Sequence, residues 1–168
     1  ELRLNQRFAK EIYLDVVAIT SNSDHARIGG SGEPIEYAVR MRRFVADALL
    51  SYRVAHNLVH FNDVRSLAAS VAAFHAQAAV AEPSSRFGTP DLLYAEALAN
   101  CQDIAKSRIA RTLEMVELLE HWTVGYFSRH QSQFQLHKRD GHIRECHGDL
   151  HLGNVVLWEK ELLPFDGI

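Results

Sequence analysis

A polar stretch close to the end of the chain holds the residues best suited to chemistry. The segment HGDLHLGN, residues 147–154, contains a carboxylate at Asp149 and an amide at Asn154, and a second carboxylate, Asp166, follows an apolar run. Phosphoryl transfer from a nucleotide needs a carboxylate near the attacking hydroxyl and oxygen ligands that hold Mg²⁺ against the phosphates. We therefore expect Asp149 to orient and deprotonate a hydroxyl, and Asn154 and Asp166 to offer oxygen ligands to the metal.

A zinc site is an alternative use of the same stretch. Cys146, His147, Asp149 and His151 are all residue types that bind zinc and support metal-assisted hydrolysis. The two histidines are four residues apart, which would place them on one face of a helix. The glycines between and after them disfavour a helix, and no second Cys or His pair follows at zinc spacing.

A purely structural loop is the other alternative. Gly148 and Gly153 would permit positive φ angles, and Asp149 and Asn154 would make hydrogen bonds within turns. Each residue taken alone is more often structural than catalytic, but their combination favours a functional site.

The elements before this stretch change in character along the chain. The first part predicts a helix over residues 1–9 and β-branched residues predict a strand over 16–22. Glycine, serine and proline predict a loop over 24–34, and alternating apolar and charged residues predict a half-buried strand over 35–44. Two strands joined across a glycine-rich loop predict an antiparallel hairpin.

The second part of the chain predicts a helical block. A short helix over 45–55 is followed by one that Asn62 or Asp63 would cap, and Thr89 and Pro90 form a capped start for the next. Helical spacing then continues from Ile109 to Leu136. After Gly141 the expected elements are short: strands over 142–147, 154–159 and 162–166, with the HGDLHLGN loop after the first and a tight turn after the second.

Composition and charge bound the class of protein. The 168 residues are 47% hydrophobic, enough for a compact core, and 18 basic against 21 acidic residues give a net charge of −3. Because no basic stripe is present, we expect no nucleic-acid partner, and no apolar run reaches the roughly 20 residues that a membrane span needs. Two cysteines are too few for a disulfide framework, and the first residues do not resemble a signal peptide. These features favour a cytoplasmic protein.

The stretch HGDLHLGN closely resembles the catalytic-loop motif H-G-D-x-H-x-x-N of the aminoglycoside phosphotransferase and choline kinase family, a branch of the protein-kinase-like fold. The following NVVLW and LLPFDGI resemble the hairpin that leads to the kinase D-F-G aspartate, here D-G-I. The opening ELRLNQRFAKEIYLDVV and the closing PFDGI resemble a bacterial subgroup of phosphotransferase-like proteins. In that subgroup a P-loop ATP-binding domain often follows the phosphotransferase-like domain.

This resemblance implies an α+β, protein-kinase-like fold that is cut at both ends. Residues 1–44 would form a partial, β-containing N-lobe with the hinge, and residues 45–168 a partial, mainly helical C-lobe with the catalytic-loop hairpin. The glycine-rich loop and the lysine-bearing strand of such kinases should precede Glu1. The chain as a fragment is therefore expected to be inactive by itself.

The resemblance also implies a role for each residue of the motif. Asp149 would be the catalytic base, and Asn154 and Asp166 would hold Mg²⁺ between the phosphates of ATP. His147 and His151 would support the catalytic loop.

The nucleotide contacts implied by the resemblance lie in the N-lobe. The backbone of the hinge would hydrogen-bond adenine, through Met41, Arg42, Arg43 and Phe44. Glu1 is the candidate for the helix glutamate that pairs with the ATP-binding lysine.

We thus expect an ATP- and Mg²⁺-dependent phosphotransferase that transfers the γ-phosphoryl group to a hydroxyl of a small molecule. The alternative is a non-catalytic, kinase-like regulatory or binding domain coupled to an adjoining ATPase domain. The presence of Asp149, Asn154 and Asp166 together argues for the enzyme, since a domain without catalysis has no need of all three.

Overall fold

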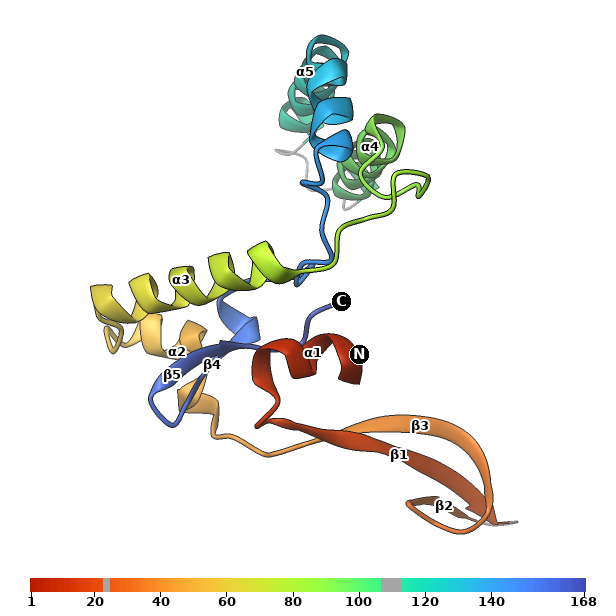
Figure 1. The fold of residues 1–168 in the computed structure, drawn as a ribbon, viewed down its shortest axis with the longest axis vertical. Coiled ribbons are helices and arrows are strands. Elements are labelled where there is room, and N and C mark those ends of the chain that lie inside the picture. The colour runs from red at the N-terminus through yellow and green to blue at the C-terminus, as the bar shows by residue number, and fades with distance from the viewer. Residues whose placement is uncertain (23–24, 107–112) are drawn as a thin grey trace. The chain divides into compact units, whose positions relative to one another are not determined.

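The computed structural model describes residues 1–22, 25–106 and 113–168, which form two compact units of an α+β protein (Figure 1). The first unit joins residues 1–77 to 146–168, and the second comprises residues 78–145. The predicted lobes, 1–44 and 45–168, divide the chain differently, and that division stays a prediction. No helix within the described ranges is long and apolar enough to cross a membrane.

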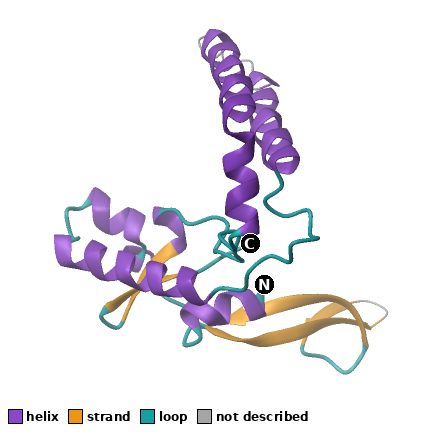
Figure 2. Cartoon of the chain, turned by 45° about the horizontal axis from the view of Figure 1, so that its top comes forward, coloured by secondary structure: helices purple, strands orange, loops and turns teal. Residues whose placement is uncertain are grey.

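The first unit opens with a helix and a three-stranded antiparallel sheet. Their bounds are α1 Leu2–Ala9, β1 Tyr13–Asn22, β2 His25–Ile28 and β3 Glu33–Met41. The sheet has the order β2-β1-β3, with Val16 opposite Val39. Figure 2 shows the strands of the protein in orange. The predicted helix and the predicted antiparallel pairing of β1 with β3 are confirmed.

Two expectations for this sheet were wrong. Residues 25–28 were expected in a loop, but they form β2 because the chain folds back and pairs with residues 19–22 of β1. The strand over 35–44 was expected to be half-buried, but Ile35 and Tyr37 are 59% and 62% exposed. This strand also ends at Met41 and not at the predicted residue 44. The next residue, Arg42, donates its N–H to the carbonyl of Ile12, which precedes β1, at 2.8 Å.

Short helices follow the sheet. They are η1 Ala46–Ala48, a 3₁₀ turn, α2 Leu50–Ala55 and α3 Phe61–Gln77. The last begins earlier than predicted. Its Asp63 carboxylate accepts from the His60 N–H at 2.8 Å, while the His60 carbonyl accepts from the Asp63 N–H at 3.0 Å. Asp63 is therefore the acidic residue that completes the cap three residues into the helix, not the residue that begins it.

The chain returns to the first unit with a hairpin, β4 Val155–Trp158 and β5 Glu161–Pro164, which was predicted from its two apolar runs. Its Val156 packs with Ala9, Ile12 and Tyr13 in a core cluster whose members are at most 1% exposed. The hairpin therefore shares one core with α1 and the start of β1. This packing holds the end of the chain against its beginning.

The second unit is built on two helices, α4 Pro90–Lys106 and α5 Leu113–Arg139. The predicted Thr89 cap is confirmed, because its hydroxyl accepts from the Leu92 N–H at 3.3 Å. Gly141, with φ of 76°, follows the end of α5 in the left-handed conformation that favours glycine. The expected strand over 142–147 was wrong, because only a single bridge joins Val80 to Arg144. Ile109 lies outside the described residues.

Candidate functional site

The predicted catalytic loop begins with a buried histidine. His147 is 2% exposed, and its Nε2 lies 2.9 Å from the Phe165 carbonyl oxygen. Its Nδ1 accepts from the Asp149 N–H at 3.3 Å, so the ring proton belongs on Nε2, which donates to Phe165. The ring of Phe8 on α1 packs edge-on against it, with centroids 5.2 Å apart. His147 thus joins the start of the loop to the segment after β5.

Asn154 and Asp149 form the polar centre of the loop. The Asn154 amide nitrogen donates to the Asp149 carbonyl oxygen at 3.0 Å and to its carboxylate at 3.1 Å. Asn154 is 7% exposed, whereas the Asp149 side chain is 52% exposed. Because the amide nitrogen faces Asp149, the amide oxygen is the atom that Asn154 can offer to a cation.

His151 lies on the solvent side of the same carboxylate. Its Nδ1 accepts from the Gly153 N–H at 3.0 Å, at the start of the 3₁₀ turn η3, Leu152–Asn154. Its Nε2 lies 3.6 Å from the Asp149 carboxylate, and the side chain is 58% exposed. The acceptor role of Nδ1 places a proton on Nε2, facing Asp149.

The segment that contains Asp166 lies against this loop. The Phe165 N–H donates to the Asn154 carbonyl at 2.9 Å, and the Ile168 N–H donates to the His147 carbonyl at 2.9 Å. Between these two bonds Asp166 is exposed and has a φ of 61°. The structure therefore brings together the segments that hold all three predicted oxygen-bearing side chains.

Two buried polar residues of the opening segment also contact Asp166 and its neighbour. Asn5, which is fully buried, donates from its amide nitrogen to the Gly167 carbonyl at 3.1 Å, and its amide oxygen accepts from the Gly167 N–H at 2.7 Å. The Tyr13 hydroxyl accepts from the Asp166 N–H at 2.9 Å. Burial raises the pKa of Tyr13, and the nearby carboxylates of Asp166 and Glu1 act in the same direction, against the opposing effect of the hydrogen bond from Asp166.

Neither Asn5 nor Tyr13 was expected from the sequence to be a site residue. A signal for Asn5 was present, since it occupies the position between Leu2 and Ala9 on the buried face of the helix. An asparagine at such a position needs hydrogen-bond partners inside the protein. The sequence offered no way to identify Gly167 as the partner, since it is 162 residues away.

Of the predicted hinge residues, Met41 is the last residue of β3, and Arg42, Arg43 and Phe44 lie between β3 and η1. The Phe44 ring packs edge-on against Phe165, with centroids 5.2 Å apart, so the hinge adjoins the segment that leads to Asp166. Met41 is half-buried, and the Arg42 N–H is already engaged by Ile12. The backbone groups of Arg43 and Phe44 make no hydrogen bond to any residue that the structure describes.

Glu1, the candidate lysine-pairing glutamate, lies at the start of α1 and is exposed. Its carbonyl accepts from the backbone N–H of Asn5 at 3.0 Å and from the Asn5 amide at 3.2 Å. Its carboxylate is close enough to the Tyr13 hydroxyl to raise the pKa of that group. Glu1 is therefore linked through the Asn5 amide to Gly167, the residue after Asp166.

The zinc alternative has no support in the structure. Among residues 1–22, 25–106 and 113–168, no group of three or more His, Cys, Asp and Glu side chains is placed to hold a metal ion. Both nitrogens of His147 are engaged by the backbone, and Cys146 is half-buried and lies outside any strand.

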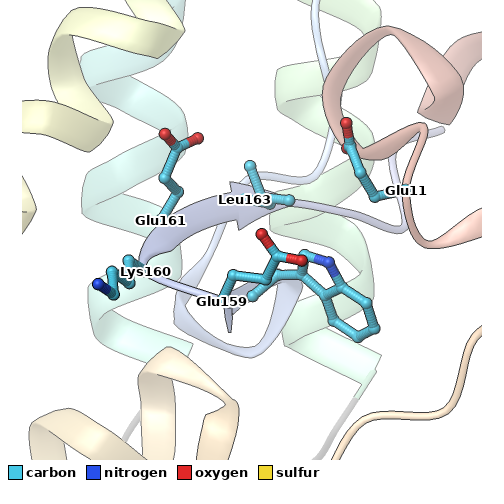
Figure 3. A pocket seen from close by; sticks show the side chains of 6 residues that line it. Glu11, Glu159, Lys160, Glu161 and Leu163 are labelled. Carbon is cyan, nitrogen blue, oxygen red and sulfur yellow. The ribbon is translucent and has the colours of Figure 1, made fainter.

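A pocket of about 420 Å³ lies at the turn of the β4–β5 hairpin (Figure 3). Its lining consists of Glu11, Leu163 and the four residues of the turn, 158–161. None of the predicted site residues lines this pocket. It belongs to the far end of the hairpin from Asp166, since β5 runs from Glu161 to Pro164 before reaching that residue.

Comparison with known proteins gives no further assignment: no family model, no curated protein and no solved structure matches this chain.

Proposed function

We propose that this chain is part of an ATP- and Mg²⁺-dependent phosphotransferase that acts on a hydroxyl of a small molecule. The observation that supports it best is the pairing of Asn154 with Asp149, 3.1 Å apart, on a loop bonded to the Asp166 segment. A base and two oxygen ligands for magnesium on adjoining segments are among the groups that phosphoryl transfer requires.

In the proposed reaction Asp149 accepts the proton of the substrate hydroxyl. The hydroxyl oxygen forms a bond to the γ-phosphorus as the bond from that phosphorus to the β–γ bridging oxygen breaks, and ADP leaves. Mg²⁺ would neutralise the charge that develops on the phosphate oxygens, and the Asn154 amide oxygen and the Asp166 carboxylate are the groups suited to hold it. Asp149 is well exposed, as a group that must meet a substrate should be.

The proposal includes a protein-kinase-like fold, with residues 1–44 as part of an N-lobe and residues 45–168 as part of a C-lobe. The backbone groups of Arg43 and Phe44, which have no hydrogen-bond partner among the described residues, are suited to hydrogen-bond an adenine base. A kinase of this kind would work in the cytoplasm, where ATP is abundant, and an adjoining P-loop domain belongs to the same proposal.

The test is a screen of the intact protein with ATP and Mg²⁺ over hydroxylated metabolites, in which ADP release and product mass are measured. We expect Asp149→Asn to reduce turnover by about 10²–10⁴-fold, the usual contribution of a general base, with nucleotide affinity nearly unchanged. Asparagine keeps an oxygen that can accept from Asn154, so the loop geometry should survive. Asp103→Asn makes the same chemical change on the exposed face of α4 and is the matched control.

Two results would count against the proposal. If Asp149→Asn phosphorylates as fast as the wild type, the assigned base is wrong. If the wild type binds nucleotide but transfers no phosphoryl group to any acceptor, a non-catalytic kinase-like regulatory domain becomes the better description.

A further inference from the structure

We propose that α1 and β1 set the conformation of the Asp166 segment through Asn5 and Tyr13, which makes both of them positioning residues for the metal-binding carboxylate. The metal-binding part of this inference rests on the proposed function. The part that concerns the conformation of the segment rests on the hydrogen bonds alone.

The Asn5 amide pairs with the backbone of Gly167 in the way that a neighbouring β-strand would. The amide group donates to the carbonyl and accepts from the N–H of the same residue, Gly167, at 3.1 and 2.7 Å. Asn5 is fully buried and Gly167 is buried, so water does not readily replace either bond. The amide is itself fixed on α1 by the Glu1 carbonyl, so a shift of the helix would move Gly167 with it.

Tyr13 fixes Asp166, the residue before Gly167. Its hydroxyl accepts from the Asp166 N–H, and its ring is 1% exposed within the core cluster that also contains Ile12 and Val156. Asp166 has a φ of 61°, a conformation that residues other than glycine adopt only when their surroundings hold them there. Tyr13 and Asn5 supply that support from one side of the segment.

The loop supplies the support from the other side. The Phe165 carbonyl binds His147, and the Ile168 N–H binds the His147 carbonyl. Asp166 is therefore held between the catalytic loop and the α1–β1 region. Its carboxylate is free of protein ion pairs within the described residues, so its direction depends on how its backbone is held.

The first experiment measures the segment directly, by amide hydrogen exchange at Asp166 and Gly167 in the chain described here. Tyr13→Phe should raise the exchange rate at Asp166 by about tenfold, the effect of losing one buried hydrogen bond. Asn5→Ala, which removes both bonds to Gly167, should raise the rate at Gly167 by at least as much. Tyr37→Phe is the matched control, because it removes the same hydroxyl from a tyrosine that is 62% exposed on β3. Tyr13→Phe keeps the ring in the core and covers the case in which Asn5→Ala fails to fold.

The second experiment measures binding of Mn²⁺ with ATP to the intact protein, with Mn²⁺ as a paramagnetic substitute for Mg²⁺. Both variants should raise the Mn²⁺ concentration for half-saturation by about tenfold at unchanged affinity for metal-free ATP, because the carboxylate is no longer held in place. Substitution of a residue with only a structural role would change stability, but it would not weaken Mn²⁺ binding while leaving the affinity for metal-free ATP unchanged.

The two experiments separate the possible failures. Wild-type exchange rates at Asp166 and Gly167 in both variants, or an increase spread evenly over β1 and β3, would overturn the inference. Faster exchange at these amides with unchanged Mn²⁺ affinity would mean that Asn5 and Tyr13 have a structural role only. Absence of Mn²⁺–ATP binding in the wild type would overturn the proposed function, while the exchange data would still decide whether Asn5 and Tyr13 hold the segment.

Discussion

Buried polar side chains join the segment 165–167 to the rest of the first unit. Asn5, Tyr13 and His147 are at most 2% exposed, and each bonds to the backbone of residues 165–167. Each of these bonds joins residues at least 18 positions apart. Because an unpaired buried backbone group costs about 1–3 kcal/mol, these side chains stabilise a segment that has no regular structure of its own.

Tyr13 gives a prediction for alkaline pH. Its pKa in the folded protein is raised, first by burial, above the ordinary value of about 10 that it has in the unfolded chain. The folded state therefore keeps this proton longer than the unfolded state, and the contribution to stability is complete below pH ~10 and is lost as pH rises through the folded pKa. In an absorbance titration near 295 nm, we expect a late-ionising tyrosine that is missing in Tyr13→Phe. The same late-ionising tyrosine in the variant would contradict the assignment.

At the scale of elements, the ends of helices and strands are set by local hydrogen bonds and by glycine. Thr89 caps α4, His60 and Asp63 cap α3, and Gly141 follows α5. The predicted catalytic loop depends on a glycine in the same way. Gly148 has a φ of 86°, and a Cβ there would lie 2.7 Å from the Ile168 carbonyl oxygen.

A pair of glycine substitutions separates strain from close contact. Gly29 also has a positive φ, 71°, but a Cβ there would meet no atom within 4 Å. Gly29→Ala should lower the free energy of unfolding by about 1–2 kcal/mol, because alanine is strained in the left-handed conformation. Gly148→Ala should cost about 1–3 kcal/mol more, because the Ile168 segment must move away. Urea denaturation measures both, and equal costs would show that the loop and the segment are not in contact in solution.

At the scale of the molecule, the two units differ in how much they bury. The first has two clusters of buried hydrophobic residues, which join α1, β1, α2 and the hairpin. In the second, the buried hydrophobic side chains among the described residues are Ala78, Cys101 and Val116. Several large side chains on α5 are exposed, including Trp122 at 55% and Leu118 at 71%.

This difference predicts unequal local stability. Helices with few buried side chains open more readily than strands in a core, so amides of α4 and α5 should exchange at least about tenfold faster than those at the start of β1. Hydrogen exchange with peptide-level mass spectrometry, comparing residues 90–106 and 113–139 with 13–19, tests this. Equal protection of the amides in both units would contradict this prediction, and it would mean that the second unit is stabilised by something other than its buried side chains.

Much of the secondary structure could be predicted from the sequence because it depends on neighbours. The α1 stripe, the β1–β3 pairing, the Thr89 cap and the final hairpin follow from periodicity, capping residues and turn residues that act over a few positions. The residues 147–154 were recognisable for the same reason, since their polar types stand close together. The roles assigned to Asp149, Asn154 and Asp166 in catalysis stay predictions.

The tertiary structure decided what depends on residues far apart in the chain. It formed β2 where a loop was expected, left Ile35 and Trp122 exposed, and placed Asn5 against Gly167. Periodicity reports which side chains lie on one face of an element, but burial depends on which other element covers that face. A hydrogen bond across 162 residues has no local signal, because only the folded chain brings its two partners within reach.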